Sequence, residues 1–190
     1  LSLHDALPIF SDELKQGAKV AVSKLRKIGI KSVLLTGDVK DTAEYISKMV
    51  GIDDWYAKLM PEDKVQKLVF LIKTNKKGKK VLYAGDGIND APVLTRADVG
   101  VAMGAIGADA AIEASDVVIN DDNLLKVYAA VKIAKLTMTT ADQNILIALV
   151  VKILFLLLGS IGLMSMWMAI FADTGVTLIA VLNALLILKH

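Results

Sequence analysis

The chain has 190 residues, of which 55% are hydrophobic, and its mean hydropathy is +0.55. Soluble proteins have an apolar share of roughly 45–50%, so part of this chain is unusually apolar. The net charge of +2 and the small aromatic share of 5% do not favour nucleic-acid binding. The sequence contains no cysteine, which excludes disulfides and thiolate metal sites in this stretch.

The charge is unevenly distributed along the chain. Residues 11–142 are rich in lysine, aspartate and glutamate, whereas residues 143–188 carry only two charges, Lys152 and Asp173. This change of composition predicts a soluble domain over 11–142 and a membrane domain over 143–190.

The soluble part alternates between apolar runs and helical patterns. In chain order we expect a helix over 12–28, a strand over 32–35, helices over 42–50 and 61–73, a strand over 80–84, a short helix from 91, a strand over 99–102, a helix over 108–113 and a strand over 117–119. Strands that alternate with helices indicate an α/β fold, with a parallel sheet and helices on both faces.

Polar loops follow two of these strands, where open α/β sheets bind ligands. Thr36-Gly37-Asp38 offers a hydroxyl and approachable backbone amides to phosphoryl oxygens. Asp86 and Asp90 place two carboxylates on one glycine-rich turn, a setting suited to Mg²⁺. Lys64, in the first turn of a predicted helix, can reach a phosphate. Each feature alone also fits a solvated surface loop.

The apolar segment of 143–188 is long enough for two membrane-spanning helices of roughly 20 residues each and a reversal. We expect the helices at about 143–163 and 166–188, with the break where glycine and serine cluster near Gly159 and Gly162. A buried hairpin of a large soluble protein is the alternative, which the length of the apolar run disfavours. Lysines flank both outer ends, which predicts that both ends face the cytoplasm; they are Lys126, Lys132, Lys135 and Lys189.

Two charged residues lie inside these spans. Counted from the turn, Lys152 and Asp173 are at depths of about 18 and 14 Å, so they can meet on neighbouring helices. Charge at such depth costs about 2.5–3.5 kcal/mol and usually has a function. Asp173 is therefore predicted to bind a divalent cation, with Lys152 as counter-charge; a purely structural salt bridge is the alternative. Asn183 is either a further polar partner or a packing residue.

Four motifs follow one another in this part of the chain. In order they are Leu35-Thr36-Gly37-Asp38, Met60-Pro61-Glu62-Asp63-Lys64, Gly85-Asp86-Gly87-Ile88-Asn89-Asp90-Ala91-Pro92 and Val99-Gly100-Val101-Ala102-Met103-Gly104. Together they resemble the phosphorylation domain of P-type ATPases, whose fold is of the haloacid-dehalogenase, Rossmann-type class. The resemblance covers nearly all of residues 11–189. It implies an enzyme that hydrolyses ATP through an aspartyl-phosphate intermediate and moves an ion across a membrane.

The resemblance also implies roles for single residues. Thr36 and Lys64 would contact the phosphoryl group within a catalytic set that also includes Gly37, Asp38, Asn89 and Asp90. Asp86, with Asp90, would hold Mg²⁺, while Asn89 and Asp90 support that loop.

The membrane part has three characteristic groups of residues: Gln143-Asn144 with Lys152, Met166-Trp167-Met168-Ala169 and Phe171-Ala172-Asp173-Thr174-Gly175. With them this part is similar to the zinc/cadmium/lead branch of the heavy-metal pumps. It implies transport of Zn²⁺, Cd²⁺ or Pb²⁺, Asp173 as the intramembrane metal ligand, Lys152 as the balancing charge, and a bacterial plasma membrane as the location.

The sequence departs from the family pattern in what it lacks. It contains no Asp-Lys-Thr-Gly-Thr nucleophile loop and no Cys-Pro-Cys. We therefore expect a carboxy-terminal fragment, inactive alone, whose partners are the lipid bilayer, a divalent ion and the amino-terminal remainder of the pump with its ATP-binding domain. Residues 1–10 do not resemble the family and are predicted to be an artefactual leader. The alternatives are a soluble phosphatase of the same fold and a non-catalytic membrane-bound module.

Overall fold

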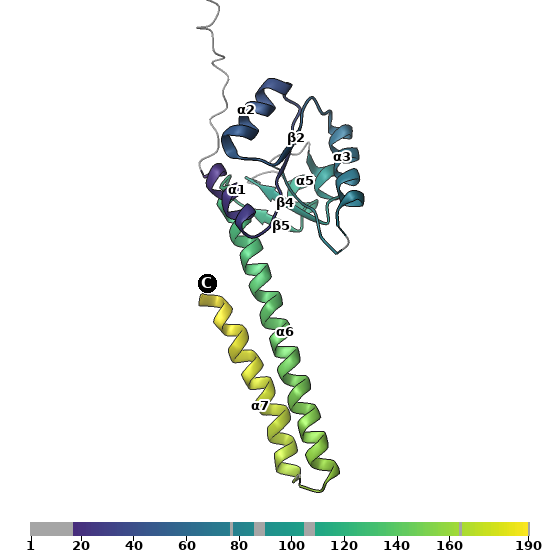
Figure 1. Cartoon of the computed structure of the whole chain (residues 1–190), viewed down its shortest axis with the longest axis vertical. Coiled ribbons are helices and arrows are strands. Elements are labelled where there is room, and N and C mark those ends of the chain that lie inside the picture. Colours follow the sequence, from purple (N-terminus) through teal and green to yellow (C-terminus); the bar gives the residue numbers. More distant parts are fainter. Residues whose placement is uncertain (1–16, 77, 86–89, 105–108, 164, 190) are drawn as a thin grey trace, which may run out of the picture. The chain divides into compact units, whose positions relative to one another are not determined.

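The structure is a computed structural model that describes residues 17–76, 78–85, 90–104, 109–163 and 165–189 (Figure 1). The chain divides into two compact units, Leu1–Tyr128 and Ala129–His190. Each unit is described by itself below.

The first unit alternates helices and strands, as the sequence predicts. Its elements are α1 (Ala18–Lys27), β1 (Val33–Leu35), α2 (Lys40–Val50), β2 (Asp54–Tyr56), α3 (Pro61–Thr74), β3 (Leu82–Gly85), α4 (Ala91–Leu94), β4 (Val99–Met103), α5 (Asp109–Glu113) and β5 (Val117–Ile119). Strand β2 was not predicted, because its three residues, Asp54, Trp55 and Tyr56, are not a run of aliphatic residues like those that mark the other strands.

All strand pairs are parallel, which confirms the predicted strand direction. Strands β1 and β2 form one sheet, with Leu34 beside Trp55, and the order in the second sheet is β3-β4-β5. Within the described residues no strand joins the two sheets, so the single predicted sheet is present as two.

Strand β4 is the centre of the larger sheet and is buried on both faces, as central parallel strands are. On one face Val101 and Met103 pack with Ile119 and with Val127 from the start of helix α6 (Leu124–Ser160). On the other face Ala102 packs with residues of α4 and α5, namely Leu94 and Ala111. Helices therefore cover both faces of this sheet, as predicted.

Three aspartates tie the strands together at their amino ends. Each directly precedes one strand and accepts a hydrogen bond from a backbone N–H at the start of the neighbouring strand. The pairs are Ser32 N to Asp53 Oδ2 (2.8 Å), Val81 N to Asp98 Oδ2 (2.9 Å) and Gly100 N to Asp116 Oδ2 (2.8 Å). The carboxylates thus accept hydrogen bonds from backbone N–H groups at the strand starts that would otherwise lack a partner.

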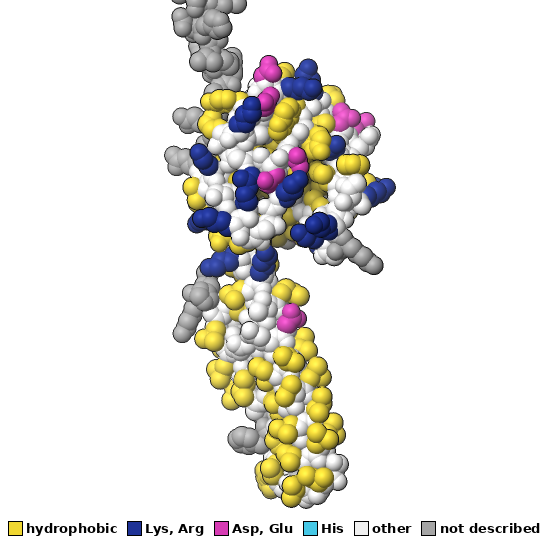
Figure 2. Space-filling model, viewed as in Figure 1, with side chains coloured by type: hydrophobic (Ala, Val, Ile, Leu, Met, Phe, Trp, Pro, Cys, Tyr) yellow, Lys and Arg dark blue, Asp and Glu magenta, His cyan; other side chains and the backbone are white. Residues whose placement is uncertain are grey.

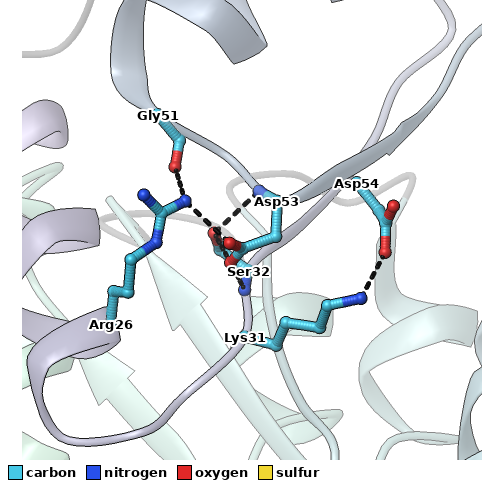
Figure 3. A network of polar contacts seen from close by, with 6 residues as sticks. All are labelled: Arg26, Lys31, Ser32, Gly51, Asp53 and Asp54. Carbon is cyan, nitrogen blue, oxygen red and sulfur yellow. Dashed lines mark hydrogen bonds and ion pairs between the residues drawn. The ribbon is translucent and has the colours of Figure 1, made fainter.

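Asp53 also joins helix α1 to this edge of the smaller sheet. Arg26 Nη2 donates to Asp53 Oδ1 at 2.7 Å and to the carbonyl of Gly51, and Lys31 Nζ pairs with Asp54 Oδ2 at 2.7 Å (Figure 3). The network holds α1 and the end of α2 against the amino ends of β1 and β2.

The second unit is a helical hairpin, formed by most of α6 together with α7 (Met166–Leu185), which a short 3-10 helix, η2 (Leu186–Lys189), follows. Helix α6 begins well before the predicted span at 143, because no glycine or proline interrupts residues 124–158. The turn lies where the glycines predict it. The N–H of Gly162, whose φ is +74°, donates to the carbonyl of Gly159.

Helix α6 is long and apolar enough to cross a membrane, and its most apolar stretch is not buried inside the structure. In α7 the apolar helical run found within the described residues is Ala172–Leu185. Hydrophobic side chains cover the visible face of the hairpin, whereas lysine and arginine are spread over the first unit (Figure 2).

Candidate functional site

The loop that follows β1 is organised by its own side chains. Thr36 Oγ1 donates to Asp38 Oδ2 at 2.7 Å, and the N–H of Asp38 donates back to Thr36 Oγ1 at 3.1 Å. A threonine that closes a turn on the residue two positions on holds the backbone in a tight bend. Gly37 and Asp38 are exposed, and Thr36 is half-buried.

A second loop, before α3, is bonded to the first. The N–H of Lys58 donates to the Asp38 carbonyl at 2.8 Å, and that of Leu59 to the Thr36 carbonyl at 3.0 Å. Lys58 has a φ of +57°, a left-handed conformation that is uncommon outside glycine. No sequence pattern predicted a part for Lys58 or Leu59, because both contribute to the site through backbone groups.

Helix α3 starts from this loop and carries Lys64 in its first turn. Asp63 caps the helix by accepting from the N–H of Met60 at 3.0 Å. Lys64 Nζ lies 3.0 Å from Asp90 Oδ1, and the two side chains are only 20% and 10% exposed. An ion pair this well buried depends on both partners, because either charge alone would be poorly solvated.

Asp90 is held close to the end of β3. A Cβ atom added to Gly85 would lie 2.9 Å from Asp90 Oδ2, so only glycine allows the carboxylate this approach. The structure thus brings Lys64 and Asp90 together and links Lys64 to Thr36 and Asp38 through the loop before α3. Asp86 and Asn89 lie outside the described residues.

The hairpin holds the other predicted pair. Lys152 and Asp173 both line a cavity of about 580 Å³ between α6 and α7, with apolar neighbours such as Phe155 and Val176. Within the described part of the chain no ion pair joins the two charges. The two residues thus line the same cavity, as expected from their similar predicted depths. They do not make the direct contact that a structural salt bridge needs.

Asn183 contacts the other helix of the hairpin. Its side-chain amide donates to Asn144 Oδ1 at 2.8 Å, and Asn144 Nδ2 donates to the Ala180 carbonyl at 3.1 Å. The structure thus gives Asn183 a polar contact with Asn144 on the facing helix, and Asn183 does not line the cavity of Lys152 and Asp173.

The chain is similar to known metal-transporting ATPases. It is 48% identical over 182 residues to the cadmium, zinc and cobalt-transporting ATPase of Bacillus subtilis (strain 168) and 46% identical over 182 residues to the zinc-transporting ATPase of Synechocystis sp.. These matches cover 95% of this chain and 26% and 25% of the two relatives, so the chain spans about a quarter of their length.

Solved structures give the same result. The crystal structure of a zinc-transporting PIB-type ATPase in its E2·Pi state matches with a TM-score of 0.83 and 37% identity, over 92% of this chain and 28% of that one. The family model for haloacid dehalogenase-like hydrolases matches residues 3–98, which is just over half of the chain. The matched range begins inside the predicted leader and contains Thr36, Lys64 and Asp90. The chain therefore belongs to the haloacid dehalogenase-like hydrolase family.

Proposed function

We propose that this chain is the carboxy-terminal part of a P-type ATPase that exports zinc, cadmium or lead ions, comprising most of its phosphorylation domain and a membrane hairpin. The observation that carries the proposal is that a single similarity to such ATPases runs over 95% of the chain and includes both units. Similarity to a phosphatase domain alone would end with the first unit.

The geometry supports a phosphoryl site at the carboxyl ends of β1 and β3. The ammonium of Lys64 neutralises phosphoryl charge there, and Asp90 keeps it in place when no phosphate is present. The hydroxyl of Thr36 and the backbone of Gly37 and Asp38 bind phosphoryl oxygens once Thr36 releases its bond to Asp38. The aspartyl nucleophile and the ATP-binding domain would come from another part of the pump.

Magnesium fits the carboxylates of this edge by their chemistry, since hard oxygen ligands suit it. Asp90 already pairs with Lys64, so Asp86 would be the main ligand, and Asn89 and Asp90 would support its loop. Within the described residues no group of three or more metal-binding side chains is present, so the proposal rests on the type of donor. When bound, the ion would neutralise part of the phosphoryl charge.

The hairpin would cross the bacterial plasma membrane with both ends in the cytoplasm, as the flanking lysines indicate. Asp173 would bind the transported ion, and Lys152 would balance its charge when the ion leaves. The open cavity supports this role, because the Asp173 carboxylate is not consumed by an ion pair with Lys152.

A chimaera tests the proposal. Residues 11–190 replace the matching segment of the Bacillus subtilis relative, and the product is expressed in cells that lack their own zinc exporter. We expect zinc and cadmium resistance that is lost in Lys64→Ala and Asp173→Ala. The matched control is Lys67→Ala, one turn along α3, where Lys67 Nζ lies 3.6 Å from the centre of the Tyr56 ring. Resistance that survives Asp173→Ala, or a folded chimaera without resistance, would count against the proposal.

A further inference from the structure

Two hydrogen bonds join α6 to α7 through Asn144, which acts as donor and acceptor at once. It accepts from the amide of Asn183 at 2.8 Å and donates to the carbonyl of Ala180 at 3.1 Å. All three residues are half-buried between the helices. Because both the oxygen and the nitrogen of the Asn144 amide are engaged, its side chain is fixed against one turn of α7.

The side chains around this pair are apolar, and their contacts do little to define how the two helices align. The helices present leucine, isoleucine and valine along most of their length, for example Leu146, Ile147, Ile179 and Leu182. Apolar contacts are non-directional, and lipid solvates such side chains as well as a neighbouring helix does. A hydrogen-bonded amide pair, in contrast, exists at one alignment of the helices only.

The pair lies on the same two helices as the charged cavity. Asn144 precedes Lys152 by eight residues and Asn183 follows Asp173 by ten, which are about 12 and 15 Å along the helices. A slip of one helical turn moves a side chain by about 5.4 Å along the hairpin, so it would carry Asp173 to a different level from Lys152. Alignment at the amide pair therefore decides whether both charges line one cavity.

We propose that Asn144 and Asn183 are positioning residues: their amide pair sets the register of α6 against α7 and so keeps Lys152 and Asp173 in one cavity. The register is a property of this chain, whereas its consequence for ion binding rests on the proposed function.

The register can be measured on the whole chain, which has no cysteine of its own. Leu149→Cys and Leu178→Cys place two spin labels on exposed positions that line neither cavity of the hairpin. In lipid vesicles we expect one narrow distance distribution. The decisive variant is Asn144→Leu with Asn183→Leu, which removes both amides and leaves neither unpaired, so that insertion is preserved. In it the distribution should broaden or shift by several ångströms.

The matched control is Gln143→Leu, which removes the neighbouring amide on α6 and should leave the distribution unchanged. Asn144→Leu alone removes both bonds and should lose the register about as fully as the double variant. Asn183→Leu leaves the bond from Asn144 to the Ala180 carbonyl and should lose it less fully. A wild-type distribution in the double variant, or equal broadening in Gln143→Leu, overturns the proposal.

The zinc dependence of ATPase activity in the chimaera tests the link to ion binding. General destabilisation of the protein would not change the zinc dependence alone. Loss of register should raise the zinc concentration for half-maximal ATPase activity by about tenfold or more, because groups that orient a metal ligand typically have effects of this size. The ATP concentration for half-maximal activity should not change. An inactive wild-type chimaera would reject the proposed function while the spin-label distances still decide the register. Unchanged zinc dependence in a variant that has lost the register would overturn the link to ion binding.

Discussion

Lys64 and Asp90 form an ion pair of 3.0 Å between the first turn of α3 and the residue that precedes α4. The two residues are 26 positions apart in the sequence, and their side chains are largely shielded from water. Each charge compensates the other, because either one alone would be poorly solvated in this shielded position. The pair also points the ammonium of Lys64 toward the end of β3, where the phosphoryl group is proposed to lie.

Breaking this pair should destabilise the first unit. Asp90→Asn keeps the size of the side chain but leaves the ammonium of Lys64 without its counter-charge, and removal of one partner of a buried pair costs about 3 kcal/mol. The free energy of unfolding of the whole chain in detergent, followed by urea titration, measures the effect. Asp109→Asn, at an exposed position of α5, is the control and should change little. Equal stability of the two variants would show that Lys64 does not depend on Asp90.

Acid should weaken the network at the amino ends of the strands. The backbone N–H of Ser32, followed by the Ser32 hydroxyl and Arg26, lowers the pKa of Asp53, and the N–H of Val81, followed by Lys80, lowers that of Asp98. A carboxyl whose pKa is lower in the folded than in the unfolded chain stabilises the fold above its unfolded pKa, and this stabilisation is lost as the pH falls through the folded value.

Unfolding free energies measured from about pH 6 down to about pH 2 should therefore fall below about pH 5. The fall should be smaller in Asp53→Asn, which removes one of the carboxyl groups whose pKa is lowered by folding. Asp109→Asn, at an exposed position outside this network, is the control. If Asp53→Asn and the parent chain showed the same slope, the Asp53 hydrogen bonds would not contribute to acid sensitivity.

A single hydroxyl in α2 should be dispensable. Ser47 Oγ is buried and has no hydrogen-bond partner within the described residues. Ser47→Ala removes this unsatisfied group and raises helix propensity, so it should stabilise the chain by about 1 kcal/mol. Thermal unfolding followed by circular dichroism detects the change. Ser115→Ala is the comparison, because the Ser115 hydroxyl donates to the Ile112 carbonyl and its loss should not stabilise.

Gly100 should tolerate no side chain. A Cβ atom at this position would lie 2.7 Å from the backbone carbonyl oxygen of Leu94, so Gly100→Ala must push α4 away from β4. Overpacking of this kind costs about 1–3 kcal/mol, and the urea midpoint should fall accordingly. In Gly37→Ala the nearest atom would be 3.4 Å from the added Cβ atom, so the urea midpoint should fall less. A similar midpoint for both variants would mean that α4 can shift without cost.

The sequence by itself determined the elements that side-chain patterns encode. Apolar runs bounded by glycine and polar loops located β1, β3, β4 and β5, and the long apolar stretch with its glycine break located the hairpin. The depths of Lys152 and Asp173 followed from counting residues, because a helix has a fixed rise. The residues of the proposed phosphoryl site were predicted because they come as a motif in chain order.

Only the tertiary structure decided which distant backbone groups meet. The left-handed Lys58, its bond to Asp38 and the short strand β2 depend on main-chain hydrogen bonds, to which every residue type contributes the same groups. The division into two sheets depends on which strand edges find a partner. The amide pair of Asn144 and Asn183, two residues 39 positions apart, depends on the alignment of two helices, which no local pattern contains. Local sequence fixes periodicity and turns, whereas register is settled by directional bonds across the fold.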